Sequence, residues 1–111
     1  MSTVRTQLLG TAPALTGIST LFEVPSGFVY VVTCATLVWG NTEISGLDAW
    51  FMRDDLTKLL RVFESEEITG SNPGFQSPLV RWVFEPGQQL IAETGDGTAD
   101  FSANGYILTL P

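Results

Sequence analysis

The stretch Phe28–Trp39 (FVYVVTCATLVW) consists mainly of β-branched and aromatic residues. Such residues favour strands over helices, because their side chains pack well on a pleated surface. Apolar residues occupy both odd and even positions of the stretch, which is typical of a strand covered on both faces. We therefore predict a central strand over residues 28–39.

Turn-forming residues flank this strand and divide most of the chain into short segments. Pro25-Ser26-Gly27 separates Ile18–Val24 from the central strand, and its proline and glycine suit a tight turn, so we expect a hairpin. In the C-terminal third, Pro86-Gly87, Asp96-Gly97 and Asn104-Gly105 are the expected turns. The strands expected between them are Leu79–Phe84, Gln89–Glu93, Thr98–Ser102 and Tyr106–Leu110. This regular spacing predicts an all-β fold, an antiparallel β-sandwich.

The middle of the chain is open to two interpretations. We favour two strands, Asp48–Arg53 and Lys58–Phe63, joined by a turn at Asp54-Asp55. The alternative is a short amphipathic helix, because the apolar residues have a spacing that also suits one face of a helix. Those residues are Leu56, Leu59, Leu60 and Phe63.

With 111 residues, the chain has room for one hydrophobic core. We expect a single sandwich domain over residues 17–111, preceded by an N-terminal arm or first strand over residues 1–16. The apolar residues Leu8, Leu9 and Leu15 precede the first expected hairpin and are candidates for packing on a neighbouring protein.

Five Lys and Arg against twelve Asp and Glu give a formal net charge of −7, which would repel nucleic acid and anionic lipid. No apolar run approaches the roughly 18 residues of a membrane span, and residues 1–10 lack the pattern of a secretory signal. We expect neither nucleic acid nor a membrane as a partner, and a protein that is made in the cytoplasm and stays soluble.

The chain has no histidine, which removes the commonest general base and metal ligand. Cys34 is flanked by apolar residues, so we expect a buried, inert thiol. Phosphate-binding glycine motifs and paired cysteines are absent, and Asp96-Gly97 is explained by a turn without calcium. We therefore expect no enzyme activity, cofactor or metal. A hydrolase that uses paired acids is kept as a third class of function, with Asp54-Asp55 or Glu64, Glu66 and Glu67 as its candidates.

Aromatic residues supply the remaining candidates for contact with a partner. Trp39 and Trp82 lie within apolar segments and are expected in the core. Trp50 and Phe51 are consecutive, so in a strand they face opposite ways and one of them lies outside or in an interface. Phe75 is a further candidate. Arg81 fits either a solvated outer face or an ion pair across a subunit boundary.

Two motifs carry a resemblance to a known group of proteins. Phe22–Val32 (FEVPSGFVYVV) resembles the opening common in small structural proteins of tailed bacteriophages. The ending is similar too, with Arg81–Phe84 (RWVF), the Pro86-Gly87 turn, Leu90–Ala92 and Gly105–Leu108 (GYIL) in the same order. Residues 47–75 match no pattern of that group.

The resemblance implies a jelly-roll-like sandwich located on the virion. It also implies partners among other virion proteins and a homo-oligomer, with a trimer as the expected form. Our leading hypothesis is a non-enzymatic, tail-associated component, a minor tail protein, that docks through the arm Val4–Leu15 and outward aromatics. The nearest alternative is a capsid decoration protein. A second class is a carbohydrate-binding module that recognises a host-surface glycan. The predicted interface residues are Leu8, Leu9, Leu15, Trp50, Phe51, Phe75 and Arg81.

Overall fold

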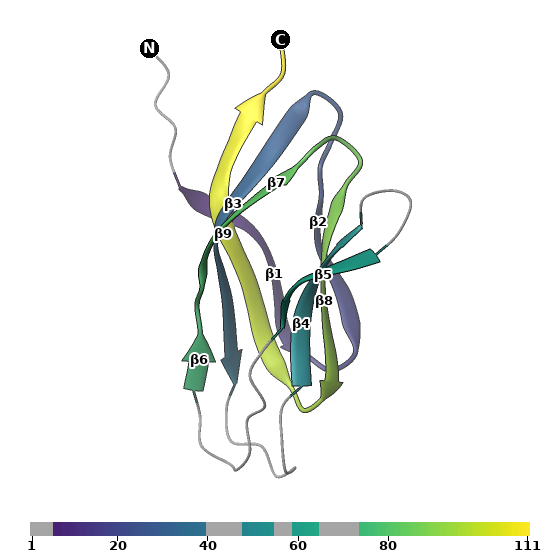
Figure 1. Cartoon of the computed structure of the whole chain (residues 1–111), viewed down its shortest axis with the longest axis vertical. Coiled ribbons are helices and arrows are strands. Elements are labelled where there is room, and N and C mark those ends of the chain that lie inside the picture. The colour runs from purple at the N-terminus through teal and green to yellow at the C-terminus, as the bar shows by residue number, and fades with distance from the viewer. Residues whose placement is uncertain (1–5, 40–47, 55–58, 65–73) are drawn as a thin grey trace.

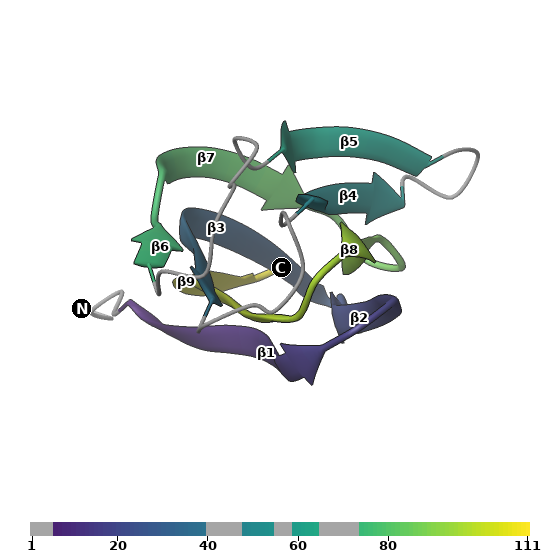
Figure 2. The same cartoon turned by 90° about the horizontal axis from the view of Figure 1, so that it is seen from below.

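The computed structural model describes residues 6–39, 48–54, 59–64 and 74–111, and these ranges contain strands and turns but no helix. The strands form two antiparallel sheets that pack face to face (Figure 1, Figure 2). Sheet A contains β1 (Gln7–Leu15), β9 (Ala99–Thr109), β3 (Phe28–Trp39), β6 (Gly74–Gln76) and β7 (Leu79–Phe84). Sheet B contains β2 (Ile18–Glu23), β8 (Gln89–Asp96), β4 (Asp48–Asp54) and β5 (Leu59–Glu64). The predicted all-β sandwich is confirmed.

The strand pairing is that of a long hairpin rolled up on itself. In chain order, β1 pairs with β9, β2 with β8, β3 with β6 and β7, and β4 with β5. Rolling then places β3 against β9 and β4 against β8. The chain therefore changes sheet at each step from β1 to β4 and again from β7 to β9, while β4 and β5 share sheet B and β6 and β7 share sheet A. This is the jelly-roll arrangement. The jelly-roll-like fold predicted from the sequence is confirmed.

This topology corrects the predicted hairpin at Pro25-Ser26-Gly27. The turn itself is present, because the Phe28 N–H donates to the Pro25 carbonyl at 3.3 Å and Gly27 has a φ of 89°. However, β2 belongs to sheet B and β3 to sheet A, so the turn carries the chain from one layer to the other. Turn residues specify a tight reversal but not whether the two strands that they join pair with each other.

The central position of β3 is confirmed, with β9 on one side and β6 and β7 on the other. A β-bulge between Val32 and Cys34 changes which side chains face the core. Before the bulge Phe28, Tyr30 and Val32 face inward, and after it Ala35, Leu37 and Trp39 do. Because of the bulge, the inward-facing residues are even-numbered before it and odd-numbered after it. This shift explains most of the apolar residues at both odd and even positions, from which the sequence had predicted a strand covered on both faces.

The middle of the chain forms the two favoured strands and not the alternative helix. β4 and β5 pair antiparallel, with Phe51 opposite Phe63 and Asp54 opposite Leu59. Asp54 of the predicted Asp54-Asp55 turn is the last residue of β4, and residues 55–58 lie outside the described residues.

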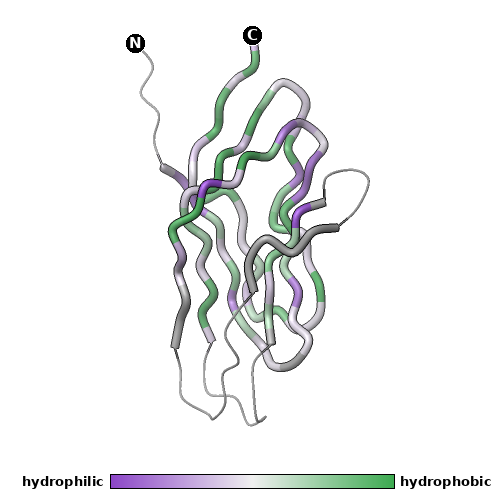
Figure 3. The backbone as a smooth tube through the Cα atoms, viewed as in Figure 1, coloured by the Kyte–Doolittle hydropathy of each residue, from purple (hydrophilic) through white to green (hydrophobic). Residues whose placement is uncertain are grey.

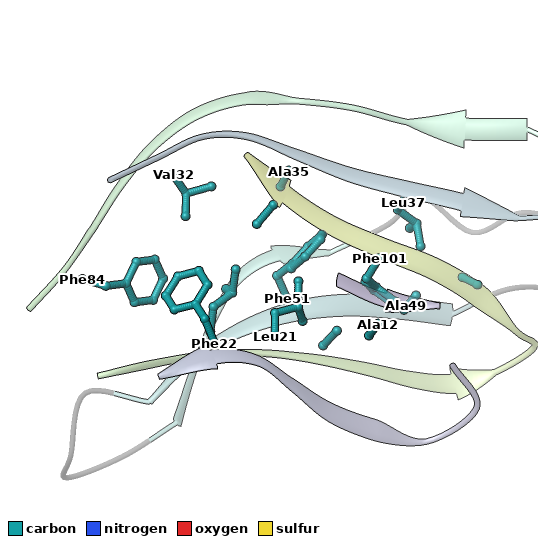
Figure 4. Packing of buried hydrophobic residues seen from close by; sticks show 14 of the residues in the cluster. Ala12, Leu21, Phe22, Val32, Ala35, Leu37, Ala49, Phe51, Phe84 and Phe101 are labelled. Carbon is teal, nitrogen blue, oxygen red and sulfur yellow. The ribbon is translucent and has the colours of Figure 1, made fainter. Parts of the chain in front are cut away.

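Aromatic side chains from both sheets meet in the core (Figure 4). Phe51 of β4 lies 5.3 Å from Phe101 of β9, ring centroid to ring centroid, in an edge-to-face arrangement, and 5.8 Å from Trp82. Phe22 makes a similar edge contact with Phe84 at 5.1 Å. Trp39 and Trp82 are partly buried and pack against this cluster, as expected from the sequence. Edge-to-face aromatic pairs contribute about 0.5–1.5 kcal/mol beyond the area that they bury.

The cationic side chain of Arg53 packs against this aromatic core. Arg53 of β4 holds its guanidinium 5.1 Å from the centroid of the Phe84 ring, and its Nη2 donates to Gln88 Oε1 at 2.7 Å. The same Gln88 oxygen accepts the Glu85 N–H of the Pro86-Gly87 turn at 2.8 Å. Arg53 and Gln88 thereby tie β4 of sheet B to the turn that joins β7 to β8.

The last strand, β9, runs unbroken from Ala99 to Thr109, so the turn predicted at Asn104-Gly105 is wrong. Gly105 serves another purpose there. A Cβ atom built on it would lie 1.8 Å from the Val31 carbonyl oxygen, because the bulged part of β3 passes very close to β9. Glycine is needed at this position for the close approach of two backbones and not for a positive φ.

The first strand, β1, pairs with β9 along its length, with irregular register between Leu8 and Gly10 and between Ala12 and Leu15. Within the second irregularity, Ala14 has a φ of 49°, in the left-handed region that L-residues rarely adopt. Its N–H donates to the Asp100 side chain.

This strain supports a prediction for Ala14. An L-residue in the left-handed conformation costs about 1–2 kcal/mol, and glycine removes this cost. Glycine also makes the unfolded chain more flexible, which lowers the stability of the folded state by about 0.4–1 kcal/mol. We expect Ala14→Gly to leave the free energy of unfolding unchanged or to raise it by up to about 1 kcal/mol. Urea unfolding would measure this, with Ala12→Gly, a change at a buried residue in the same strand, as the destabilised comparison. A loss above about 1 kcal/mol in Ala14→Gly would contradict the strain.

Candidate functional site

The outer face of sheet A is the surface that faces away from sheet B on β1, β9, β3 and β7. Strand register places its side chains in rows. In one row Leu108 of β9 lies opposite Val29 of β3, and in the next Val31 of β3 lies between Tyr106 of β9 and Val83 of β7. These side chains alternate with core residues along the same strands, which fixes them on the outside.

Several apolar side chains on this face are open to solvent. Leu79 at the start of β7 is 87% exposed, and Leu8 of β1 is 58% exposed. Val38, Val83 and Leu108 are each about 40% exposed. Among the described residues, the other large apolar side chains of comparable exposure are Ile18 in sheet B and Leu110, which directly follows β9. Among the side chains that the structure describes, the exposed apolar residues are therefore concentrated on sheet A.

The centre of this face carries small polar groups. Ser77 Oγ lies 2.9 Å from Thr36 Oγ1 and 3.2 Å from the Cys34 sulfur. The prediction of a buried Cys34 is wrong, because the bulge turns this residue outward and leaves it half-buried beside Ser77. Thr36 lies opposite Ser102 of β9, and Thr11 of β1 follows Ser102 in the same row.

Charged residues are nearly absent from the strands of sheet A, which contain Arg81 and Asp100 and no others. The strands of sheet B contain six acids and two arginines. The chain as a whole has a formal net charge of −7, so the charge is distributed very unequally between the two layers. In Figure 3 the strands of sheet A are coloured mainly white to green, with few purple stretches. The charged residues of sheet B are Glu23, Asp48, Arg53, Asp54, Arg61, Glu64, Glu93 and Asp96.

Metal-binding groups, membrane-spanning helices and the paired acids can be examined only in the described part of the chain. No three His, Cys, Asp or Glu side chains in these ranges gather where they could hold a metal ion. The same ranges contain no helix of the length and apolarity needed to cross a membrane. Of the paired acids considered for hydrolysis, Asp55, Glu66 and Glu67 lie outside the described residues, as do the side chains of Asp54 and Glu64.

The chain resembles a solved structure, although it has no match among family models. No family model matches the chain, and no curated protein sequence matches it. A solved structure described as a pentameric capsid protein isolated from metagenomic phage sequences matches with a TM-score of 0.42 and 14% sequence identity. The match covers 91% of this chain and 62% of that protein, so the chain spans less than two-thirds of its length.

The interface residues predicted in β1 lie on two different faces. Leu8 is on the outer face of sheet A, opposite Asn104 of β9. Leu9 and Leu15 are half-buried and pack against the core. Because Gln7–Leu15 is a full strand of sheet A, this part of the expected arm Val4–Leu15 is built into the sandwich. Residues 1–5 lie outside the described residues.

The predicted aromatic contacts are placed less favourably. Phe51 faces the core and is fully buried, so it has no surface to offer a partner. Trp50 faces the other side of sheet B, but it is 7% exposed and lies in a small cluster with Met52 and Ile91. Trp50 and Phe51 do face opposite ways, as expected of adjacent residues in a strand. However, Trp50, which faces away from the core, is also covered by its neighbours. The backbone of Phe75 pairs with Val38, while its side chain lies outside the described residues.

Arg81 is exposed on the outer face of sheet A, between Leu79 and Val83 of β7. Sequence reasoning named Arg81 but missed its two apolar neighbours. The signal was present, because Leu79, Arg81 and Val83 alternate with Val80, Trp82 and Phe84, which face the core. Assigning Trp82 to the core places Leu79 and Val83 outside.

Proposed function

We propose that this chain is a non-enzymatic structural protein of a tailed-bacteriophage virion, located with the tail, and that it assembles through the outer face of sheet A. The observation that carries the proposal is the exposed apolar surface of that face, from which charge is nearly absent. Charged residues are depleted from the centres of protein interfaces, while apolar and aromatic residues are enriched there. The motifs at Phe22–Val32 and Arg81–Leu108 support the assignment to a virion.

The jelly-roll topology is compatible with this role, since the same architecture is common in viral coat proteins. The fold by itself does not select a function, because lectins and cupins share it. The surface favours a protein partner. A carbohydrate-binding module needs exposed aromatic rings, and of the three rings considered for stacking, Trp50 and Phe51 are buried while the Phe75 side chain lies outside the described residues. The outer face of sheet A presents mainly leucine and valine beside the half-buried Tyr106, and such a surface suits contact with protein.

Location on a purified particle tests the proposal directly. We expect antibodies against the chain, conjugated to gold, to label the tails of purified virions in electron micrographs. Labelling spread over the heads would support the decoration alternative in place of the tail location. Absence of the chain from purified virions, measured by mass spectrometry, would overturn the structural role altogether.

A charge placed on the outer face should block assembly without harming the fold. Leu79 is 87% exposed, so Leu79→Glu should change the free energy of unfolding by no more than about 0.5 kcal/mol. A buried, unpaired carboxylate at an interface is strongly unfavourable. We therefore expect incorporation of the variant into particles to fall by at least about tenfold in a complementation assay.

Ile18→Glu is the matched control, because Ile18 is 58% exposed but lies on sheet B. It introduces the same charge in place of an exposed aliphatic residue. The proposed surface requires Ile18→Glu to be incorporated normally. Equal incorporation of Leu79→Glu and the parent chain would show that assembly uses another face.

A further inference from the structure

The two charges on the outer face of sheet A have opposite signs and lie at separate positions along β3. Arg81 lies between Leu79, which pairs with Cys34, and Val83, which pairs with Val31. Asp100 pairs with Val38, several residues further along β3. Both side chains are exposed. The strands of this face therefore have no net charge, but they have a positive and a negative position.

This pattern bears on the kind of partner that the face accepts. A second copy of the chain also has a formal net charge of −7, so two copies repel each other through any surface that carries an excess of acids. The strands of sheet B have such an excess in their composition, with six acids and two arginines. The outer face of sheet A avoids this repulsion. A basic partner would instead be drawn to the acidic residues elsewhere.

We infer that the outer face of sheet A binds the same face of a second copy, with Arg81 of each copy placed against Asp100 of the other. A two-fold axis makes such an interface self-complementary, because each contact between two different residues then occurs twice. An axis that lies in the plane of the face, midway between Arg81 and Asp100, brings the two pairs together. The inference deepens the proposed function, on whose docking face it rests, by naming one partner of that face.

The side chains near this midpoint are small, which permits close packing of two sheets. Thr36, Ser77 and Ser102 lie on the outer face between the levels of Arg81 and Asp100. Packed sheets lie about 10 Å apart, and small side chains at the centre leave space for the larger ones around them. Leu79 contributes apolar area beside Arg81.

Charge reversal tests the pairing. Self-association of the whole chain would be measured by sedimentation equilibrium at low salt. Arg81→Glu and Asp100→Lys should each weaken the dimer at least about tenfold, because like charges then meet twice across the axis. The combined variant R81E/D100K should restore affinity to within about threefold of the parent, since opposite charges meet again. Glu23→Lys, at an exposed residue of β2 in sheet B, makes the same charge change as Asp100→Lys away from the face and should not weaken the dimer.

Asp100 also accepts the Ala14 N–H, so Asp100→Lys can loosen β1. Asp100→Asn retains an acceptor oxygen for that hydrogen bond and removes only the charge. In this background Arg81→Glu no longer meets a carboxylate, so R81E/D100N should dimerise more tightly than R81E alone. This comparison decides the pairing even where Asp100→Lys fails to fold.

A chain that stays monomeric at all concentrations overturns the inference. A dimer whose affinity is restored neither in R81E/D100K nor in R81E/D100N, relative to R81E alone, also overturns it. Those results leave the proposed function intact if the chain is still found on virions. Conversely, a dimer that responds to the charge swaps while the chain is absent from virions would support the inference and remove the proposed function.

Discussion

Replacing Gly105 with alanine is expected to prevent the chain from folding. The added Cβ would lie 1.8 Å from the Val31 carbonyl oxygen, 2.8 Å from the carbonyl carbon and 2.9 Å from the Val32 Cα. All three are backbone atoms of the central strand β3, so no side-chain rotation can relieve the clash. The two strands would have to separate where they pair most extensively, from Phe28 opposite Thr109 to Val38 opposite Asp100.

We expect a loss of more than about 4 kcal/mol, the range reached only by severe disruption of a core or backbone. Domains of this size have about 5–15 kcal/mol of stability in total. The variant should therefore be insoluble or should lack the far-ultraviolet circular dichroism of a β-sheet. A Gly105→Ala protein that unfolds at the same urea concentration as the parent would contradict the close approach of β9 and β3.

Gly27→Ala is the control that separates close approach from backbone conformation. Gly27 has a φ of 89°, and a Cβ added there meets nothing within 4 Å. Its substitution adds only the strain of an L-residue in the left-handed region, about 1–2 kcal/mol. The two glycines are thus expected to differ clearly, although both resemble turn residues in the sequence.

The strands were predictable because their residues satisfy local preferences. The central strand, β4, β5 and β7 were placed within one or two residues by β-branched and aromatic composition and by the turns between segments. The pairing partners were not predictable in the same way. Pro25-Ser26-Gly27 and Asn104-Gly105 look alike as turn signals, yet one carries the chain between layers and the other lies inside a strand. Gly105 lies inside a strand because β9 passes close to β3 beside its bulge, and that bulge is far from Asn104-Gly105 along the chain.

The candidate site was predictable only where alternation is regular. In β7 the assignment of Trp82 to the core determines the outward position of Arg81 and its neighbours. In β3 the bulge interrupts the alternation, so Cys34 turned out to lie on the outer face although its neighbours in sequence are apolar. For Trp50, the sequence pattern correctly predicts that it faces away from Phe51, but burial of the outer residue depends on contacts made elsewhere in the fold.

Phe51→Ala is expected to destabilise the isolated chain by about 3–5 kcal/mol, the usual cost of removing a buried phenylalanine. Phe51 is fully buried and contacts both Phe101 and Trp82 across the sandwich, so truncation leaves a cavity at the centre of the aromatic cluster. Urea unfolding would measure the loss, with Leu79→Ala, at a side chain that is 87% exposed, as the comparison that should change by no more than about 0.5 kcal/mol. If Phe51→Ala and the parent are equally stable, the Phe51 ring lies outside the core and is again a candidate for contact with a partner. A large loss in the isolated chain instead means that any assembly defect of Phe51→Ala reports on folding, whereas the defect expected for Leu79→Glu reports on the interface itself.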